Sequence, residues 1–155
     1  MKALKMDDGT RWSWITVMLL LFAAAFLAVT ETAFASVSRN KMKISAERGD
    51  TRAVKAMYVL DNFELAVTTL LICANIVHIA AASIVTMAVT RLWGLTAVSV
   101  STVVTTLVVF FAGEMLPKSI GKKYSLKYSL ANAGVLCLLM KIFSPVAKLL
   151  STIGN

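Results

Sequence analysis

Two carboxylates lie at the ends of long apolar runs, and they are the side chains best placed to do chemistry. Glu31 follows the run of residues 15–29, and Glu114 follows the run of residues 95–112, just before Pro117. A carboxylate at the edge of hydrocarbon is costly unless a cation, a proton or a buried partner compensates its charge. We therefore expect these residues to handle an ion.

Oxygen donors accompany the two carboxylates. An amide, Asn75, lies in the apolar run of residues 63–90, and hydroxyls follow one another along the third run at Ser99, Ser101, Thr102, Thr105 and Thr106. The chain has only two cysteines and one histidine. Because hard cations such as Mg²⁺ and Ca²⁺ prefer oxygen ligands, this inventory favours them over zinc or copper.

Backbone oxygens are a further expectation near Glu114. Pro117 lacks an amide hydrogen and weakens the helical turn that contains Gly113. Interrupted membrane helices expose carbonyl groups that can bind cations. We therefore expect a helix interruption and free carbonyls beside the Glu114 carboxylate.

Structural interpretations stay open for each of these polar residues. Glu31 can be an interfacial residue that reaches the lipid headgroups, and Glu114 can be an acceptor for backbone amides. Asn75 can hold two helices together without binding an ion, and for His78 packing or helix bridging is the favoured interpretation.

The elements that must position these residues follow from composition. Of 155 residues, 58% are hydrophobic and only two are prolines, and the mean hydropathy is +0.77. A helix needs roughly 20 residues to cross a bilayer, and three runs reach that length, at about 14–35, 63–90 and 95–116. A fourth run, 130–150, contains Lys141, Pro145 and Lys148, which favours an amphipathic helix at the interface. We predict an all-α membrane protein.

Charge orients the predicted spans. Six basic residues lie between the first two spans and four follow the third, whereas the second connection has only Arg91. By the positive-inside rule, the first connection and the C-terminus are cytoplasmic and the N-terminus is outside, in a multi-pass protein of the cell membrane. The first connection has the pattern of a helical hairpin closed by Gly49, and Glu31 and Glu114 then share a depth of about 25 to 28 Å from the outer helix ends.

The net charge of +8 is explained by this topology. Its basic residues flank the spans without a nucleic-acid-binding motif, so no nucleic-acid partner is expected. The Lys118 to Lys127 cluster can contact anionic membrane lipids. An enzyme is the least favoured class, because no paired nucleophile and base is recognisable.

Four motifs together resemble a known family. They are Thr30-Glu31-Thr32-Ala33, Glu47-Arg48-Gly49-Asp50, Thr69-Leu70-Leu71-Ile72 leading to Asn75, and Gly113-Glu114-Met115-Leu116-Pro117-Lys118. In these the chain resembles the transmembrane domain of the CNNM/CorC (CorB) family of Mg²⁺ transporters. The resemblance extends over nearly the whole chain, and the last motif is its most specific part.

The resemblance implies a fold, a cargo and partners. It implies three transmembrane helices plus a juxtamembrane helix, a homodimer, and a dehydrated Mg²⁺ in a cavity that faces the cytoplasm. In the family a cytoplasmic CBS-domain pair follows, often with a small C-terminal domain. We expect residues 1–155 to be a single transmembrane domain, with those modules absent from this chain.

The resemblance also implies a ligand set. Glu114 is its charged ligand, Asn75 and Thr30 are neutral ligands, Cys73 or Ala74 supplies a carbonyl, and Glu31 is a second carboxylate that ligates or tunes the site. Two motifs depart from the family: S-G-S-E reads Ala28-Val29-Thr30-Glu31, and G-N-N reads Cys73-Ala74-Asn75. The leading prediction is therefore Mg²⁺ transport, and the alternative is a membrane-anchored regulatory or scaffold protein of the same fold.

Overall fold

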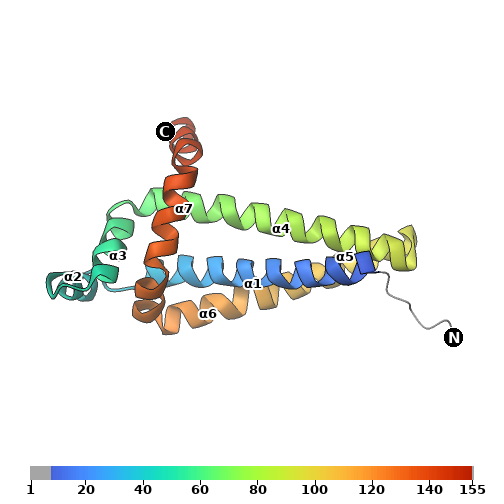
Figure 1. Ribbon diagram of the computed structural model, residues 1–155, viewed down its shortest axis with the longest axis horizontal. Helices are drawn as coiled ribbons and strands as arrows, with labels where there is room; N and C mark the ends of the chain where they lie inside the picture. The colour runs from blue at the N-terminus through green and yellow to red at the C-terminus, as the bar shows by residue number, and fades with distance from the viewer. Residues whose placement is uncertain (1–7, 155) are drawn as a thin grey trace.

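Three long helical rods run side by side along the molecule (Figure 1). The computed structural model describes residues 8–154. The first two rods are α1 (Asp8–Ser36) and α4 (Phe63–Trp93). The third consists of the short turn η1 (Leu95–Ala97), α5 (Val98–Val108), the π-helix η2 (Val109–Met115) and α6 (Leu116–Lys123). At 1.5 Å per residue, each rod is about 44 to 47 Å long, enough to cross a bilayer.

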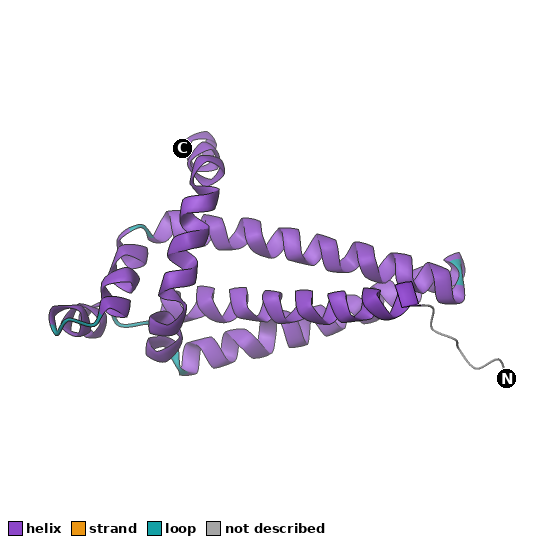
Figure 2. Ribbon diagram, in the orientation of Figure 1, coloured by secondary structure: helices purple, strands orange, loops and turns teal. Residues whose placement is uncertain are grey.

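Three further helices gather at one end of these rods. They are α2 (Arg39–Glu47), α3 (Thr51–Asp61) and α7 (Ser125–Gly154). Helix α7 crosses the long rods at a steep angle, and α3 lies beside it (Figure 1). Only short connections separate the helices within residues 8–154, and that part of the chain contains no strand (Figure 2).

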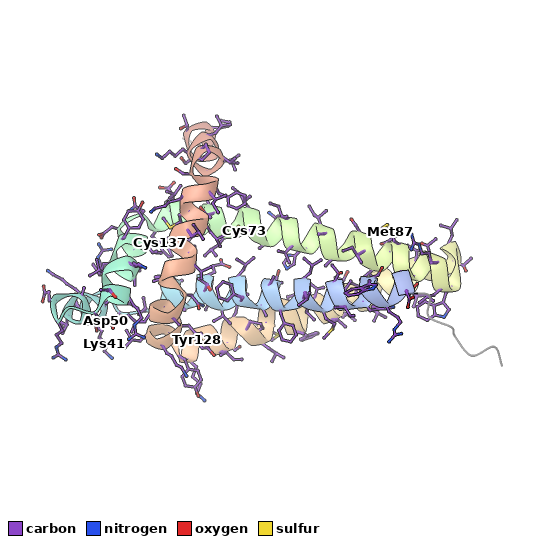
Figure 3. The ribbon with its side chains drawn as sticks, in the orientation of Figure 1. Lys41, Asp50, Cys73, Met87, Tyr128 and Cys137 are labelled. Atoms are coloured by element: carbon purple, nitrogen blue, oxygen red, sulfur yellow. The ribbon has the colours of Figure 1, made fainter. Side chains whose placement is uncertain are left out.

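Helices α2 and α3 pack on each other as a hairpin because the turn between them has suitable residues. Gly49 adopts a φ of 88°, a left-handed conformation that favours glycine. Asp50 then begins α3, where its carboxylate accepts a hydrogen bond from the Arg52 amide at 2.9 Å. The Arg52 guanidinium also donates to this carboxylate and holds the pKa of Asp50 below its usual range. Asp50 and Lys41 mark this end of the molecule in Figure 3.

The buried core lies where α1 and α4 meet α2, α3 and α7. Its larger side chains come from all five helices and are Leu27, Phe34, Met42, Val59, Leu70, Leu136 and Met140. The third rod contributes little to it, since no residue in its most apolar 18-residue stretch is buried. The rods are therefore joined firmly at one end, while much of the third rod faces outward.

Four helical segments are long and apolar enough to cross a membrane: Asp8–Ser36, Phe63–Trp93, Leu95–Lys123 and Ser125–Gly154. The chain is an all-helical, multi-pass membrane protein, as the sequence predicts. The fourth segment is α7, for which the sequence favours an interfacial position. The predicted outward location of the N-terminus concerns residues 1–7, which lie outside the described part of the chain.

The interruption predicted near Pro117 exists, but it is not a break at the proline. Helical structure continues from Leu95 to Lys123, and the interruption is the π-helical segment η2 on the N-terminal side of Pro117. The amide of Leu116 donates to the carbonyl of Phe111, five residues earlier. Pro117 then falls in the first turn of α6, where a missing amide hydrogen is tolerated.

Helix α6 approaches α1 at a position that only glycine fits. A Cβ atom on Gly121 would lie 2.6 Å from the carbonyl oxygen of Val29 and 3.2 Å from its Cα atom. Because these are backbone atoms of a long helix, they cannot move aside without shifting α1. Gly121 therefore sets the spacing between the first and third rods.

We expect Gly121→Ala to lower the free energy of unfolding by about 1 to 3 kcal/mol, the usual effect of overpacking a close contact. The measurement is thermal unfolding of the protein purified in detergent. Gly134→Ala is the matched control, since a Cβ there meets only the Lys55 Nζ atom, at 3.9 Å. Equal melting temperatures for both variants would contradict the role assigned to Gly121.

Candidate functional site

A small cavity lies between the three rods near the end that carries α7. Its volume is about 30 Å³, which is space for one water molecule or ion. Helix α1 contributes Ala24, Leu27, Ala28 and Glu31, helix α4 contributes Leu70, Ala74 and His78, and the third rod contributes Glu114 and Lys118. The two carboxylates that the sequence singles out thus line the same cavity from different rods.

Each carboxylate in the cavity faces a basic side chain. The Oε1 atom of Glu114 lies 3.7 Å from Nε2 of His78, and Oε2 of Glu31 lies 3.7 Å from Nζ of Lys118. Both distances exceed a normal hydrogen bond, so these are electrostatic contacts. The His78 Nε2 atom is buried and has no hydrogen-bond partner. The cavity therefore holds charged and polar groups whose bonding capacity is not filled.

A larger groove begins where the cavity ends. It has a volume of about 360 Å³ and lies between α4 and the third rod. Its hydroxyl-bearing residues are Thr86, Ser101, Thr102, Thr105 and Thr106, and its other polar residues are His78 and Glu114. His78 and Glu114 thus line both spaces, and the polar surface of the groove leads to the cavity through this pair.

Most of the predicted hydroxyl stripe faces this groove. Thr102 and Thr106 donate to the carbonyls four residues earlier in their own helix, both at 2.8 Å. Their donor capacity is therefore used, and their oxygen lone pairs remain able to accept a hydrogen bond or to approach a cation. Ser99, also predicted, is exposed and does not line the groove.

Thr30, a predicted ligand, lies outside the cavity and connects two helices. It is 1% exposed, donates to the Phe26 carbonyl at 2.7 Å and accepts from the Asn132 Nδ2 atom at 2.8 Å. The second of these bonds joins α1 to α7 in the protein interior. The hydroxyl is therefore engaged on both its donor and acceptor sides.

The predicted ligands on α4 separate into different faces. Ala74 lines the cavity together with His78, four residues later on the same helical face. Asn75 is exposed and lines neither the cavity nor the groove. Cys73 is buried in the hydrophobic core (Figure 3). Because α4 is continuous through these positions, the carbonyls of Cys73 and Ala74 belong to its regular hydrogen-bonded ladder.

Two basic residues at the site were not among the ligands predicted from sequence. His78 shares its helical face with Ala74, a spacing that points to the same surface, and Lys118 follows Glu114 by four residues. Asn132 was not singled out either, although an amide within an apolar helix usually finds a buried partner. The sequence signal for His78 and Lys118 was therefore their four-residue spacing from Ala74 and Glu114. This spacing identifies a site residue only once it is known which helix faces line the cavity.

The arrangement suits a loosely held cation better than a tightly chelated one. Among residues 8–154, no three or more His, Cys, Asp or Glu side chains are grouped closely enough to hold a metal ion. A cation at the cavity would contact Glu114, with Glu31 available from another helix, and would complete its coordination with water.

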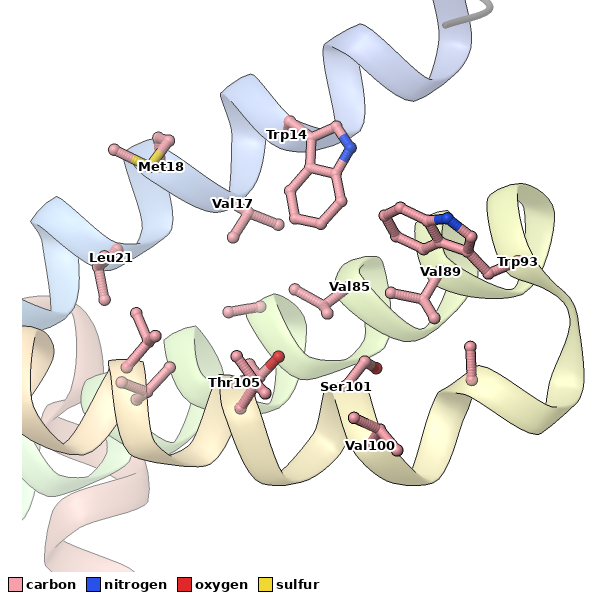
Figure 4. A pocket seen from close by; sticks show the side chains of 15 residues that line it. Trp14, Val17, Met18, Leu21, Val85, Val89, Trp93, Val100, Ser101 and Thr105 are labelled. Atoms are coloured by element: carbon pink, nitrogen blue, oxygen red, sulfur yellow. The ribbon is translucent and has the colours of Figure 1, made fainter. Parts of the chain in front are cut away.

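A third space, at the far end of the rods, has a different character. It is a groove of about 480 Å³ between α1, α4 and α5, and Trp14 and Trp93 lie at its mouth (Figure 4). Its lining is apolar except for hydroxyls such as those of Ser101 and Thr105. It has no charged group for an ion, and its tryptophans are residues typical of a membrane interface.

Comparison with known proteins finds related membrane proteins. The family described as cyclin M transmembrane N-terminal domain (CNNM) matches residues 14–155. A UPF0053 protein of Haemophilus influenzae is 28% identical over 138 residues, which cover 89% of this chain and 33% of that protein. The UPF0053 inner membrane protein YfjD of Escherichia coli is 28% identical over 130 residues, 84% of this chain and 30% of that protein. The chain thus spans about a third of these relatives.

A plant relative has a similar region. A chloroplastic DUF21 domain-containing protein of Arabidopsis thaliana is 32% identical over 106 residues, which cover 68% of this chain and 16% of that protein.

We expect Thr30→Val to lower the free energy of unfolding by about 1 to 3 kcal/mol, because it leaves the buried Asn132 amide without its acceptor. Thr30→Ser keeps the hydroxyl and serves as the matched control. Thermal unfolding in detergent, with and without Mg²⁺, measures both effects. A loss of Mg²⁺ binding in Thr30→Val without any loss of stability would instead assign Thr30 to the ion site.

Proposed function

We propose that this chain, which belongs to the CNNM (cyclin M transmembrane N-terminal domain) family, carries Mg²⁺ across the membrane. The observation that supports this most directly is the position of Glu114, which lines both the small cavity and the hydroxyl-lined groove. A carboxylate shared by two adjoining spaces between membrane helices can pass a cation from one to the other. Other divalent cations of similar ligand preference fall within the same proposal.

The proposed transport step requires an exchange of partners in the cavity. A cation that enters between Glu31 and Glu114 displaces the Lys118 ammonium from Glu31 and the His78 ring from Glu114. The two carboxylates then balance the charge of one divalent ion. Because two like charges repel strongly at short range, Lys118 and the cation cannot occupy the cavity together.

The size of the cavity bears on the hydration of the ion. About 30 Å³ accommodates one water-sized particle, so a cation that enters without a change of shape must lose most of its water. Ala28 and Ala74 line the cavity at the two motifs where this chain departs from its family, and they offer no side-chain oxygen. Mg²⁺ usually retains several waters. We infer that the cavity widens to admit a partly hydrated ion.

The π-helical segment supplies a further oxygen in this proposal. In the register of η2, the carbonyl of Ala112 would bond an amide five residues later, and that residue is Pro117, which has no amide hydrogen. An unpaired carbonyl at this depth is costly in hydrocarbon. It becomes favourable as an additional ligand or water acceptor beside Glu114.

The proposed membrane placement uses three spans. Helix α1, helix α4 and the Leu95–Lys123 rod cross the bilayer, and α7 lies along the cytoplasmic boundary together with α2 and α3. The crossing of α7 over the rods and the lysines within it support this placement. The N-terminus is then outside, and the C-terminus leads into the cytoplasm, where the CBS domains of a longer protein would follow.

A homodimer completes the proposal. The third rod exposes large apolar side chains that include Val103, Leu107, Phe110 and Phe111. Such a surface suits either lipid or a second copy of the chain.

The second candidate function is a membrane-anchored regulatory or scaffold protein. The observation that favours it is that both carboxylates already have basic partners within the chain. Such partners stabilise carboxylates between membrane helices without any metal. Ion flux into liposomes that contain the full-length protein separates the two functions, because a scaffold would give no flux under any gradient.

We expect Glu114→Gln to weaken Mg²⁺ binding at least tenfold, since it removes the charge that both spaces share. The measurement is titration calorimetry of the purified protein, followed by Mg²⁺ flux in liposomes. Glu47→Gln, an exposed carboxylate on α2, is the matched control. Wild-type affinity in Glu114→Gln would overturn the proposed site.

We expect Lys118→Met to strengthen Mg²⁺ binding about tenfold, because removal of a nearby positive charge is worth on the order of 1 to 2 kcal/mol even when solvent screens it. Lys118→Arg keeps the charge and should retain the wild-type affinity. Lys122→Met, on the same helix but exposed, controls for a general change of charge. Weaker binding in Lys118→Met would indicate that the lysine supports the site instead of competing with the ion.

A further inference from the structure

We propose that the groove between α3 and α7 binds the headgroup of an anionic phospholipid. The groove has a volume of about 530 Å³ and is separate from the cavity of Glu31 and Glu114. Helix α3 contributes Lys55 on one wall, and helix α7 contributes Lys141 on the other. Cys137 also lines the groove from α7, which lies beside α3 (Figure 3).

The charge of the groove is positive and uncompensated. No aspartate or glutamate lines it. Neither Lys55 nor Lys141 takes part in the ion pairs formed within residues 8–154. Both side chains are exposed, so their ammonium groups can move to a ligand at little cost. Two ammonium groups on facing walls match a phosphate oxyanion.

Much of the lining of the groove is apolar, and this favours a lipid over a free phosphate as the ligand. Val54 is 55% exposed, Leu138 is 57% exposed and Tyr58 is 48% exposed. These side chains give a surface on which the first part of an acyl chain can lie, and the Tyr58 hydroxyl can donate to a headgroup oxygen. A free phosphate would use the lysines alone and leave this apolar surface in water.

Gly134 is the place where α7 comes close to the Lys55 side chain. It is an exposed glycine in the middle of a helix, and a Cβ atom there would lie 3.9 Å from the Lys55 Nζ atom. The Lys55 ammonium thus lies close to α7 at Gly134, on the helix that also carries Lys141. The two positive groups therefore approach one ligand from adjoining helices.

The position of the groove fits a headgroup. In the membrane placement proposed above, α7 runs along the cytoplasmic boundary, and the α3–α7 groove lies at that level (Figure 1). The cytoplasmic leaflet carries anionic lipids, which attract basic groups close to the membrane. The lipid site rests on that placement but not on Mg²⁺ transport.

The test compares lipids on the purified protein in detergent by native mass spectrometry and by thermal unfolding. We expect phosphatidylglycerol to remain bound and to raise the melting temperature, and phosphatidylcholine to do neither. The Lys55→Gln/Lys141→Gln double variant should bind phosphatidylglycerol at least fivefold more weakly. Lys41→Gln/Lys43→Gln removes the same charge from other exposed positions, on α2, and should bind as the wild type does.

Three outcomes would overturn the proposal. Undiminished phosphatidylglycerol binding by the Lys55/Lys141 variant would place the lipid elsewhere. Equal stabilisation by phosphatidylcholine would show that charge is irrelevant, and equal stabilisation by inorganic phosphate would identify a soluble anion as the ligand. Circular dichroism of both variants establishes that they remain folded, and Mg²⁺ is absent throughout, so the result does not depend on the ion site.

Discussion

The placement of two carboxylates between membrane helices is the constraint on which the structure depends. Glu31 and Glu114 come from different rods and reach the same small cavity, where each faces one basic side chain. Neither could remain charged against hydrocarbon alone. The three rods must therefore meet at this depth, and the residues that let them approach have a role as important as that of the charges themselves.

Small residues make this close approach possible. Gly121 brings α6 against the backbone of α1. At Gly113, a Cβ atom would lie only 3.3 Å from the Leu21 side chain, so this glycine also allows close packing. The walls of the cavity include three small side chains, Ala24 and Ala28 on α1 and Ala74 on α4. Small residues at helix contacts are a general means of association in membranes, where no hydrophobic force drives helices together. Here they also determine how near the carboxylates come to their partners.

Much of the architecture was predictable because it follows from length and hydrophobicity. The apolar runs at 14–35, 63–90 and 95–116 each lie within one of the three rods, and the motif around Glu114 indicated the family. These features depend on local composition and on strings of adjacent residues. The shared depth of Glu31 and Glu114 could also be predicted, because the depth of a residue in the membrane can be counted along its helix.

The details of the site were not predictable in the same way, because they depend on the rotation of each helix. One step along α4 separates Ala74, which lines the cavity, from Asn75, which is exposed. The π-helical register of η2 rotates the residues around Glu114 by an amount that no spacing rule gives. Thr30 faces Asn132, about a hundred residues later, and this contact needs the position of α7 over α1.

The uneven distribution of burial bears on how such a site could work. Glu31 belongs to α1, which is fixed in the core at the α7 end. Glu114 belongs to a rod whose most apolar stretch has no buried residue and which is held against α1 at Gly121. Lys118 lies on the same rod as Glu114, one helical turn away. A movement of the third rod that widens the cavity would carry Glu114 and Lys118 together and break the Glu31–Lys118 contact, and it would have to overcome the close packing of Gly121 on α1. Under the proposed function, the movement that makes room for a cation is also the movement that removes its competitor.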